Sequence, residues 1–184
     1  MEFEKLLKMR RSVRKYGLRR VTFQQVGEIC NAATFSPMAG NIYSVRFIVV
    51  STKKKIKALA GAAEQPFIAQ APFVVVVYSD PLLVKKSYGS RAAMYVRQQA
   101  GAAIENMLLR AADIGLGSCW IGWFDEEIVK RIVRLPDNVQ VEALLPIGHP
   151  LEKHVVKKKP DLKLITYFED FKQETMPKEI KVSP

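Results

Sequence analysis

Three short stretches of the sequence carry side chains whose types and spacing suit ligand binding. The first runs from Arg10 to Arg14 and reads RRSVR. In an extended chain Arg10, Ser12 and Arg14 point to one side and Arg11 points to the other. Two guanidinium groups with a hydroxyl between them can hold a phosphate or another planar anion. The same cations could instead form only the solvated end of a helix, where they are favourable for the helix dipole.

The second and third stretches are loops rich in small residues. Residues 36–41 read SPMAGN, in which small side chains let a ligand approach the backbone and Asn41 can both donate and accept hydrogen bonds. Residues 115–122 read GLGSCWIG; no GK[ST] follows them, and the GxGxxG spacing of dinucleotide-binding folds is absent. The backbone of this third stretch can still face a flat ligand, although turns use the same residues routinely. None of the three stretches assigns a function on its own.

Side chains for nucleophilic or metal chemistry are scarce. Cys30 and Cys119 are the only cysteines and neither belongs to a CxxC motif, so we expect two reduced thiols and no disulfide. His149 and His154 are the only histidines. These four residues have neither the spacing of a zinc site nor the parts of a histidine-based triad. The sequence therefore predicts no metal centre.

The chain is strongly basic: its 184 residues include 29 Lys and Arg against 18 Asp and Glu, which gives a net charge of +11. Hydrophobic residues make up 48% of the chain, which is enough for a core and too much for a disordered protein. The cations cluster in residues 1–20, 53–57 and 157–159. Such runs can bind nucleic acid, hold a small phosphorylated ligand, or only keep the protein soluble. The sequence holds no apolar run of membrane-spanning length and no recognisable signal peptide, so we expect a cytoplasmic protein without a membrane partner.

The apolar pattern predicts an α+β fold, in which a sheet carries helices on both faces. Apolar runs without alternation indicate strands that are covered on both faces. Thr22 and Gln25 match a capping box, Asp125 suits an N-cap, and Gly115 suits the position after the last turn of a helix. Helices are expected at residues 2–10, 22–35, 54–63, 91–114 and 126–133, and strands at residues 46–51, 73–78, 118–122, 141–147 and, on a sheet edge of this chain or of a partner, 164–168.

The long helix expected at residues 91–114 is apolar on nearly every side and carries Ala100, Gly101, Ala102 and Ala103 in succession. This cluster of small residues lets another backbone approach closely. Burial against a second subunit would cover so apolar a helix, and a buried central helix in a monomer would do the same. From the residues alone, both alternatives stay open.

Taken together and in this order, the motifs resemble the nitroreductase family of FMN-dependent oxidoreductases. The resemblance spans nearly the whole chain, and its most specific part is the block at residues 98–127. The matching stretches are RRSVRKY at 10–16, SPMAGN at 36–41, APFVVVV at 71–77, QQAGAAIENMLLRAADIGLGSCWIGWFDEE at 98–127 and ALLPIGHP at 143–150. The sequence departs from the common family pattern at Tyr43-Ser44-Val45 and at Gln99.

The resemblance implies a mostly antiparallel sheet flanked by helices, and a homodimer that binds one FMN in each of two clefts at the subunit interface. Residues 1–150 would form the FMN-binding domain. Residues 151–184 would form an extension that wraps the partner subunit and exchanges a strand with its sheet. The two subunits would therefore interlock.

The resemblance also implies roles for individual residues. Arg10 and Ser12 would hold the phosphate side of FMN, and Arg14 would lie near the pyrimidine edge, where its charge would stabilise the reduced flavin. The loop of residues 36–41 would come from the partner subunit, and backbone atoms of residues 121–123 would line the ring near its reactive nitrogen. The full set assigned to the cofactor is Arg10, Arg11, Ser12, Arg14, Ser36, Pro37, Met38, Asn41, Ile121, Gly122, Trp123, Lys157 and Lys159.

The activity that the resemblance implies is centred on the flavin. Hydride would pass from NAD(P)H to FMN, and the electrons would then pass to a nitroaromatic, a quinone or a related small acceptor by a ping-pong mechanism. Because the cofactor performs the difficult step, the scarcity of histidine and cysteine is no objection. One alternative is a specialised flavoprotein of the same fold, with dehalogenating or flavin-destroying activity. Another is a basic nucleic-acid-binding module, although the basic runs carry no recognised motif and no interleaved aromatic residues.

Overall fold

The computed structural model describes residues 2–151 and 159–175. The chain divides into two compact units, residues 1–154 and residues 155–184. Within the described residues, the first unit holds all the α-helices and strands, and the second unit holds one short 3-10 helix, Leu162–Leu164.

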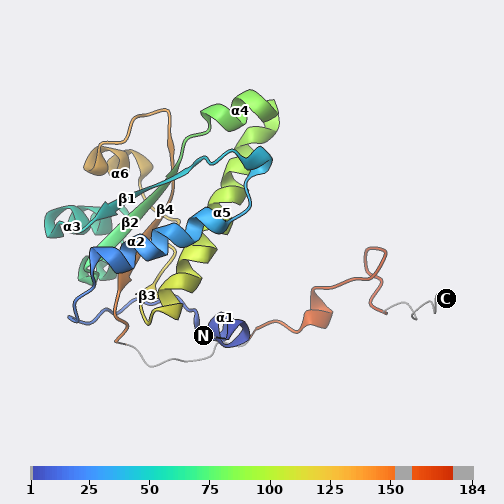
Figure 1. The fold of residues 1–184 in the computed structure, drawn as a ribbon, viewed down its shortest axis with the longest axis horizontal. Helices are drawn as coiled ribbons and strands as arrows, with labels where there is room; N and C mark the ends of the chain where they lie inside the picture. Colours follow the sequence, from blue (N-terminus) through green and yellow to red (C-terminus); the bar gives the residue numbers. More distant parts are fainter. Residues whose placement is uncertain (1, 152–158, 176–184) are drawn as a thin grey trace. The chain divides into compact units, whose positions relative to one another are not determined.

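The first unit is built on a four-stranded sheet (Figure 1). The strands lie in the order β1-β2-β4-β3, and each neighbouring pair is antiparallel. β2 reads FVVVVYS and is buried over nearly its whole length, because it lies inside the sheet with helices on both faces. The strands are β1 (Val45–Val50), β2 (Phe73–Ser79), β3 (Gly117–Ser118) and β4 (Gln140–Gly148).

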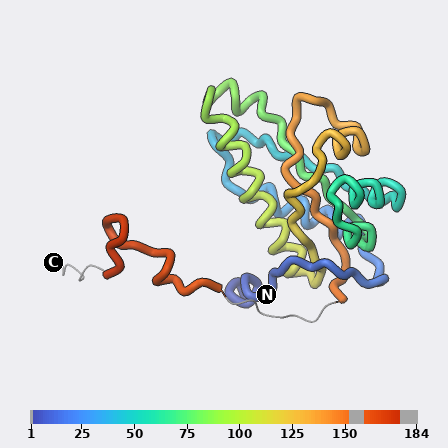
Figure 2. The backbone as a smooth tube through the Cα atoms, turned by 180° about the vertical axis from the view of Figure 1, so that it is seen from behind, coloured from blue at the N-terminus to red at the C-terminus, as the bar shows by residue number. Residues whose placement is uncertain are grey.

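Helices cover both faces of this sheet, as the view from behind also shows (Figure 2). On one face α2 and α5 pack against the sheet, so that Ile104 lies in one buried cluster with Val75. On the other face α3 and α6 pack, and Leu59 shares a second buried cluster with Val76. The described α-helices are α1 (Phe3–Met9), α2 (Phe23–Ala32), α3 (Lys53–Ala62), α4 (Leu82–Tyr88), α5 (Ala92–Asp113) and α6 (Glu126–Val133). The predicted α+β fold, a mostly antiparallel sheet flanked by helices, is confirmed.

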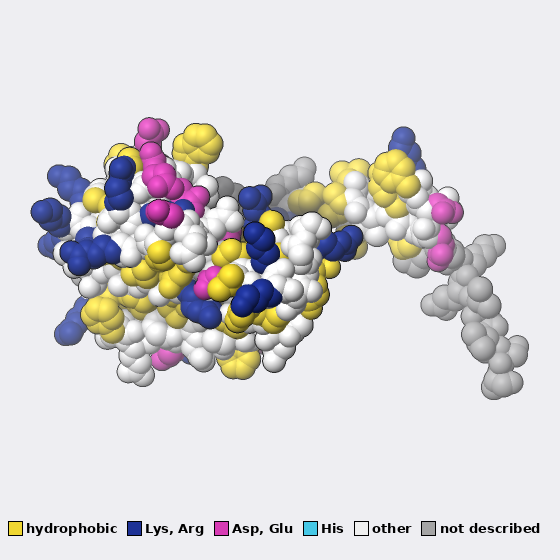
Figure 3. Space-filling model, turned by 90° about the horizontal axis from the view of Figure 1, so that it is seen from above, with side chains coloured by type: hydrophobic (Ala, Val, Ile, Leu, Met, Phe, Trp, Pro, Cys, Tyr) yellow, Lys and Arg dark blue, Asp and Glu magenta, His cyan; other side chains and the backbone are white. Residues whose placement is uncertain are grey.

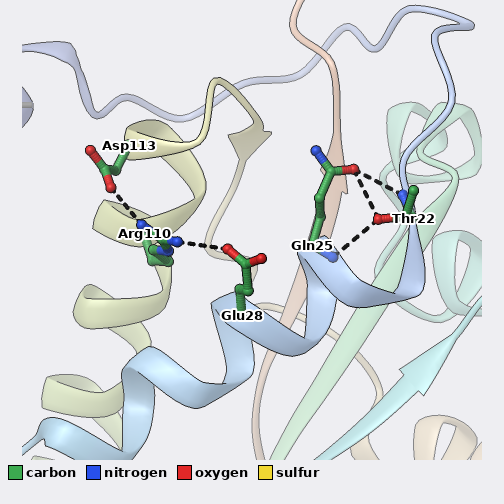
Figure 4. Close-up of polar contacts among 5 residues, drawn as sticks. All are labelled: Thr22, Gln25, Glu28, Arg110 and Asp113. Carbon is green, nitrogen blue, oxygen red and sulfur yellow. Dashed lines mark hydrogen bonds and ion pairs between the residues drawn. The ribbon is translucent and has the colours of Figure 1, made fainter.

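The start of α2 and its contact with α5 rest on short polar contacts (Figure 4). The Thr22 hydroxyl accepts the N–H of Gln25 at 3.2 Å, and the Gln25 side chain accepts the N–H of Thr22 at 2.9 Å, which confirms the predicted capping box. Arg110 on α5 donates to Glu28 on α2 at 2.6 Å and to Asp113 at 2.7 Å. The Arg110–Glu28 pair thus links α5 to α2 beside the buried apolar cluster that the two helices share.

Two other helix ends are formed as the sequence predicts. The Asp125 side chain accepts the N–H of Ile128 at 2.9 Å and caps α6. Gly115 follows the end of α5 with φ of +75°, in the left-handed region that favours glycine, and its N–H donates to the Ala112 carbonyl at 3.1 Å.

The strand expected at residues 118–122 is wrong in extent. β3 ends at Ser118, and beyond it only Ile121 pairs with the sheet, through a bridge to Leu144. Between them Trp120 turns toward α5, and its ring lies 3.8 Å from the point where a Cβ on Gly101 would stand. The chain therefore leaves the regular strand after Ser118 and returns to the sheet at Ile121.

The strand expected at residues 164–168 is also not formed within this chain's described residues. The N–H of Leu164 donates to the Asp161 carbonyl at 3.0 Å, and the Asp161 side chain accepts the N–H of Lys163 at 3.1 Å. This local turn satisfies backbone groups that a strand would have offered to a neighbour. Pairing of the segment with a partner subunit stays a prediction. A search of the described helices finds none with the length and apolar character of a membrane span.

Candidate functional site

The first and third predicted stretches lie side by side. The N–H of Val13 donates to the Ser118 carbonyl at 2.9 Å, and Ser12 forms a parallel bridge with Ser118. The segment therefore continues the sheet beyond β3. At Gly117 the two backbones approach so closely that a Cβ would stand 2.7 Å from a methyl group of Val13. Only glycine fits there, so the sequence brings the basic stretch directly against the small-residue loop.

The side chains of residues 12–14 alternate as the extended geometry predicts, whereas Arg10 and Arg11, predicted to point to opposite sides, line the same cavity. Val13 is buried at 2% exposure, while Ser12 and Arg14 are exposed. Tyr16 is also buried, and its hydroxyl lies 2.8 Å from the Val13 carbonyl, to which it donates. These contacts hold the backbone of the stretch, and the side chains of Ser12 and Arg14 are exposed beside it.

Arg10 is tied to the long helix. Its Nε atom lies 3.1 Å from a carboxylate oxygen of Glu105 on α5. Arg10 and Arg11 also line a cavity of about 210 Å³, together with Gly117 and Ser118. Glu105 was not anticipated from the sequence, because an exposed acid in a helix carries no signal for a partner 95 residues away.

Residues 121–123 divide into a buried anchor and two exposed neighbours. The N–H of Ile121 donates to the Leu144 carbonyl at 3.1 Å, and the Ile121 carbonyl accepts from Leu144 at 3.0 Å. Gly122 and Trp123 are exposed, Trp123 at 78%. Among the described residues, no backbone carbonyl accepts their N–H groups. Ile121 therefore serves as the anchor, and the two residues after it present free N–H donors.

The 36–41 loop is shaped by its own backbone. The Ser36 hydroxyl donates to the Ala33 carbonyl at 2.5 Å, so its proton is used within the turn. Gly40 and Asn41 have φ of +56° and +57°, and a Cβ on Gly40 would stand 2.5 Å from the Tyr88 hydroxyl. The exposed Asn41 follows this strained turn, which fixes its position.

Pro37 and Met38 line a different cavity, of about 340 Å³, against the first half of α5. On α5 the lining of that cavity ends at Ala102, whereas the lining of the cavity at Arg10 begins at Leu108. Six helical residues correspond to about 9 Å along the helix axis. A single chain therefore does not bring the 36–41 loop and the basic stretch into one cavity.

The two predicted lysines belong to the second unit. Lys159 is exposed in the second unit, and Lys157 lies outside the described residues. Their assignment to the phosphate side of the cofactor stays a prediction.

Two residues that depart from the common family pattern contact each other. The Ser44 hydroxyl donates to the side-chain oxygen of Gln99 at 2.6 Å, and both residues are buried. The amide nitrogen of Gln99 is buried without a hydrogen-bond partner among the described residues. Gln99 also lines the cavity of Pro37 and Met38, so the pair changes the wall of that cavity.

Both thiols are held protonated by burial. Burial raises the pKa of Cys30 to about 11. Burial also raises the pKa of Cys119, against the smaller opposite effects of the Arg14 charge and of a hydrogen bond with Ser12. A search of the described residues finds no group of three His, Cys, Asp or Glu side chains that could hold a metal ion. The donors that the described residues of this site offer are the cations of the 10–14 stretch and the backbone N–H groups of Gly122 and Trp123.

Comparisons with known proteins give the family of the chain. The sequence model of the nitroreductase family matches residues 7–65 and 58–149. A relative from Archaeoglobus fulgidus, named as an NADH dehydrogenase/NAD(P)H nitroreductase, is 32% identical over 154 residues, which cover 81% of this chain and 86% of that protein. An iodotyrosine deiodinase from Thermotoga neapolitana is 23% identical over 171 residues, covering 79% of this chain and 87% of that protein.

The fold comparison gives the same result. The solved structure of an FMN-dependent nitroreductase from Clostridium difficile superposes with a TM-score of 0.78 at 26% identity, covering 90% of this chain and 98% of that chain. The match of the family model to most of the sequence and the likeness in fold confirm the resemblance found in the motifs. The chain belongs to the nitroreductase family.

Proposed function

We propose that this chain is an FMN-dependent oxidoreductase that takes hydride from NAD(P)H and passes the electrons to a small second substrate. The observation that carries this proposal is the pairing of Val13 with Ser118, which places the Arg10–Arg14 stretch beside the loop that ends at Gly122 and Trp123. The names of the Archaeoglobus fulgidus relative and of the Clostridium difficile structure support both NAD(P)H and FMN.

The donor set of the site suits FMN. Arg10, Arg11 and Ser12 offer cations and a hydroxyl to a phosphate. Arg14 is exposed on the same side of the extended segment as Ser12 and can face the electron-rich edge of the ring. The exposed Gly122 has no Cβ to hold a flat ring away from the backbone.

When bound, FMN supplies the capacity to accept hydride from a nicotinamide and to return the electrons to a second substrate. The residues of this chain bind and orient. Arg14 would offer a permanent positive charge to the electron-rich edge of the ring, and the N–H groups of Gly122 and Trp123 would be hydrogen-bond donors for it. No side chain has to act as a nucleophile, which agrees with two thiols that are held protonated.

A second copy of the chain would complete the site. The cavity at Arg10 holds about 210 Å³, whereas pockets for ligands of this size usually hold about 300–1,000 Å³. The 36–41 loop, which offers Pro37, Met38 and Asn41, borders a separate cavity about 9 Å away along α5. Exposed apolar side chains, among them Phe35 at 79% and Trp123 at 78%, remain to be covered. A homodimer in which the loop of each chain faces the basic stretch of the other satisfies all three observations.

The division of labour along the chain follows from this dimer. Residues 1–150 would carry the FMN site, and residues 151–184 would reach the partner subunit, bringing Lys157 and Lys159 toward the phosphate. In the second unit Leu164, Ile165 and Phe171 are exposed at 75%, 64% and 80%, as expected of side chains that pack on another surface. A cytoplasmic location fits an enzyme that uses NAD(P)H and whose two cysteines are reduced.

For the second substrate we propose nitroaromatics or quinones, reduced by a ping-pong mechanism at the position that NAD(P)H has left. Dehalogenation of an aromatic substrate is the second candidate, because one relative carries the name iodotyrosine deiodinase. Steady-state oxidation of NADH and of NADPH with menadione, nitrofurazone and iodotyrosine separates these alternatives. Parallel lines in double-reciprocal plots are expected for the acceptor that is used.

The decisive experiment is an absorbance spectrum of the purified protein together with its mass in solution. We expect flavin bands, one FMN per chain and a dimer. R10Q and R14Q should weaken FMN retention at least tenfold, since each removes a charge-assisted contact. R131Q, which changes an exposed arginine on α6, is the matched control and should retain FMN. A protein that stays colourless after FMN is added, or that runs as a monomer, contradicts the proposal.

A further inference from the structure

A second cavity, of about 620 Å³, lies apart from the candidate flavin site and shares none of its lining residues. It is formed by the linker between α1 and α2, the start of α3 and the segment before β2. In Figures 1 and 2 the bend of this linker and α3 lie on the same side of the first unit. The lining residues are Gly17, Leu18, Arg19, Arg20, Val21, Ser51, Lys53, Ile56, Lys57, Ala69, Gln70, Ala71, Pro72 and Phe73.

The charge of this cavity has one sign. Arg19, Arg20, Lys53 and Lys57 line it, and no Asp or Glu is among its described lining residues. Within the described chain, none of these four cations makes an ion pair or a side-chain hydrogen bond. Figure 3 keeps the horizontal axis of Figure 1 and shows Lys and Arg side chains gathered at the end where α3 lies. Four unpaired cations around one cavity repel one another, and a bound anion would offset this repulsion.

The start of α3 adds to the positive potential. Its first turn holds Lys53, Lys54 and Lys55 and no acidic residue, and Thr52 makes no side-chain cap. Cations at the N-terminal end oppose the helix dipole, so this arrangement does not stabilise the helix. Lys53 and Lys57 are four residues apart and share one helical face, and that face lines the cavity. Cations where a helix start prefers acidic residues, at the wall of a cavity, indicate a ligand that binds to this positive charge.

The remaining walls favour a ligand with a flat, apolar part. Val21, Ile56 and Phe73 form a buried floor, at 5%, 3% and 5% exposure. Leu18 is fully exposed at the rim, where it can cover a ring. The side-chain amide of Gln70 can both donate to and accept from the edge of a base. The volume lies within the usual range for small-molecule pockets.

We propose that this cavity binds a nucleotide that carries two or more phosphates, at a site separate from the flavin. The four cations hold the phosphates, and the apolar floor with Leu18 holds the base. A small ligand is favoured over a nucleic-acid strand because the cations surround a hollow with an apolar floor, whereas a strand needs a charged track with stacking platforms along it.

The test is calorimetric titration of the FMN-saturated protein with ATP, in the absence of NAD(P)H. We expect saturable binding of one ATP per chain, weaker binding of inorganic triphosphate, and a decrease in affinity as salt is raised. The variant K53Q/K57Q should weaken ATP binding at least tenfold, because it removes two charge-assisted contacts. The control K54Q/K55Q removes the same charge from the same helix turn outside the cavity lining and should change the affinity less than twofold.

Both variants should keep the flavin spectrum and the far-UV circular dichroism of the parent protein, which shows that they are folded. Absence of saturable ATP binding overturns the proposal. Equal losses in the two variants overturn it as well, since the effect would then come from the general field of the lysines. Equal affinity for inorganic triphosphate removes the nucleotide assignment, and tighter binding of a single-stranded oligonucleotide than of ATP shows a nucleic-acid surface instead.

Discussion

Gly117 offers a direct test of how the basic stretch is held against β3. Its backbone φ is not in the left-handed region, so alanine introduces no backbone strain there. A Cβ at this position would stand 2.7, 2.9 and 2.9 Å from three atoms of Val13. The three contacts involve the Cβ and both methyl groups of one buried side chain, which cannot swing away as a flexible surface chain would. The substitution Gly117→Ala must therefore push the two segments apart.

The size of the effect follows from the two interactions that are lost. Overpacking in a filled interior costs about 1–3 kcal/mol. Loss of the bond from the Val13 N–H to the Ser118 carbonyl adds about 0.5–1.5 kcal/mol. We expect Gly117→Ala to lower the free energy of unfolding by about 2–4 kcal/mol in all. Gly27→Ala is the matched control: nothing lies within 4 Å of its Cβ position in α2, and removing a helical glycine should stabilise by about 0.5–1 kcal/mol.

Urea unfolding followed by circular dichroism measures both changes, and titration with FMN measures the consequence for the site. Because Arg10 and Ser12 move with Val13, Gly117→Ala should weaken FMN binding while Gly27→Ala should not. The double variant Val13→Gly/Gly117→Ala removes all three clashing atoms, so its destabilisation should be smaller than the sum of the single ones. A Gly117→Ala protein as stable as the parent, with unchanged FMN affinity, would refute the pairing.

Three further predictions concern single side chains. Thr22→Ala removes the capping box of α2 and should lower the free energy of unfolding, measured by urea denaturation, by about 0.5–2 kcal/mol. Thr22→Ser keeps a capping hydroxyl and should retain most of the stability that the capping box provides. With a pKa of about 11 against an ordinary 9.0, Cys30 should react with iodoacetamide at pH 8 roughly a hundredfold more slowly than an ordinary thiol, and at the ordinary rate in urea, as followed by mass spectrometry. Burial raises the pKa of Glu142 above 4.5, and this effect outweighs the hydrogen bond that the Ser79 hydroxyl donates to the carboxylate. The contribution of Glu142 to the free energy of unfolding is therefore complete below pH 4.5, and it is lost as the pH rises through the folded-state pKa. Glu142→Gln should accordingly stabilise the protein at pH 7 by less than about 1 kcal/mol, since the carboxylate stays partly solvated, and the difference should vanish near pH 4.

The features that could be predicted from the sequence are those that depend on neighbours in the chain. The capping box at Thr22, the N-cap at Asp125 and the left-handed Gly115 each involve groups within a few residues. The buried strand at 73–79 was recognisable because it lies inside the sheet and needs apolar side chains on both faces. Local chemistry thus determined where these elements begin and end.

The features that escaped prediction depend on contacts between distant parts of the chain. Nothing in the sequence pairs Arg10 with Glu105, or Ser44 with Gln99, because each member is an ordinary residue of its own element. Within this chain's described residues the expected strand at 164–168 is absent for a related reason: an apolar run forms a strand only where a sheet edge is offered to it, and Asp161 provides a local turn instead. Its pairing with a partner subunit stays a prediction.

The two proposed anion sites differ in how their cations are held, and the difference bears on their use. Arg10 has one of its nitrogens engaged by Glu105, which fixes the guanidinium while its remaining N–H groups can still donate to a phosphate. Lys53 and Lys57 are long, exposed and unpaired, so a ligand must order them as it binds. The entropy lost when these lysines become ordered weakens ligand binding. The pre-organised site at Arg10 therefore suits a cofactor that stays bound, and the site at Lys53 and Lys57 suits a ligand that binds and dissociates readily. On these two proposals, the Arg10 site suits retention of its ligand and the Lys53–Lys57 site suits release.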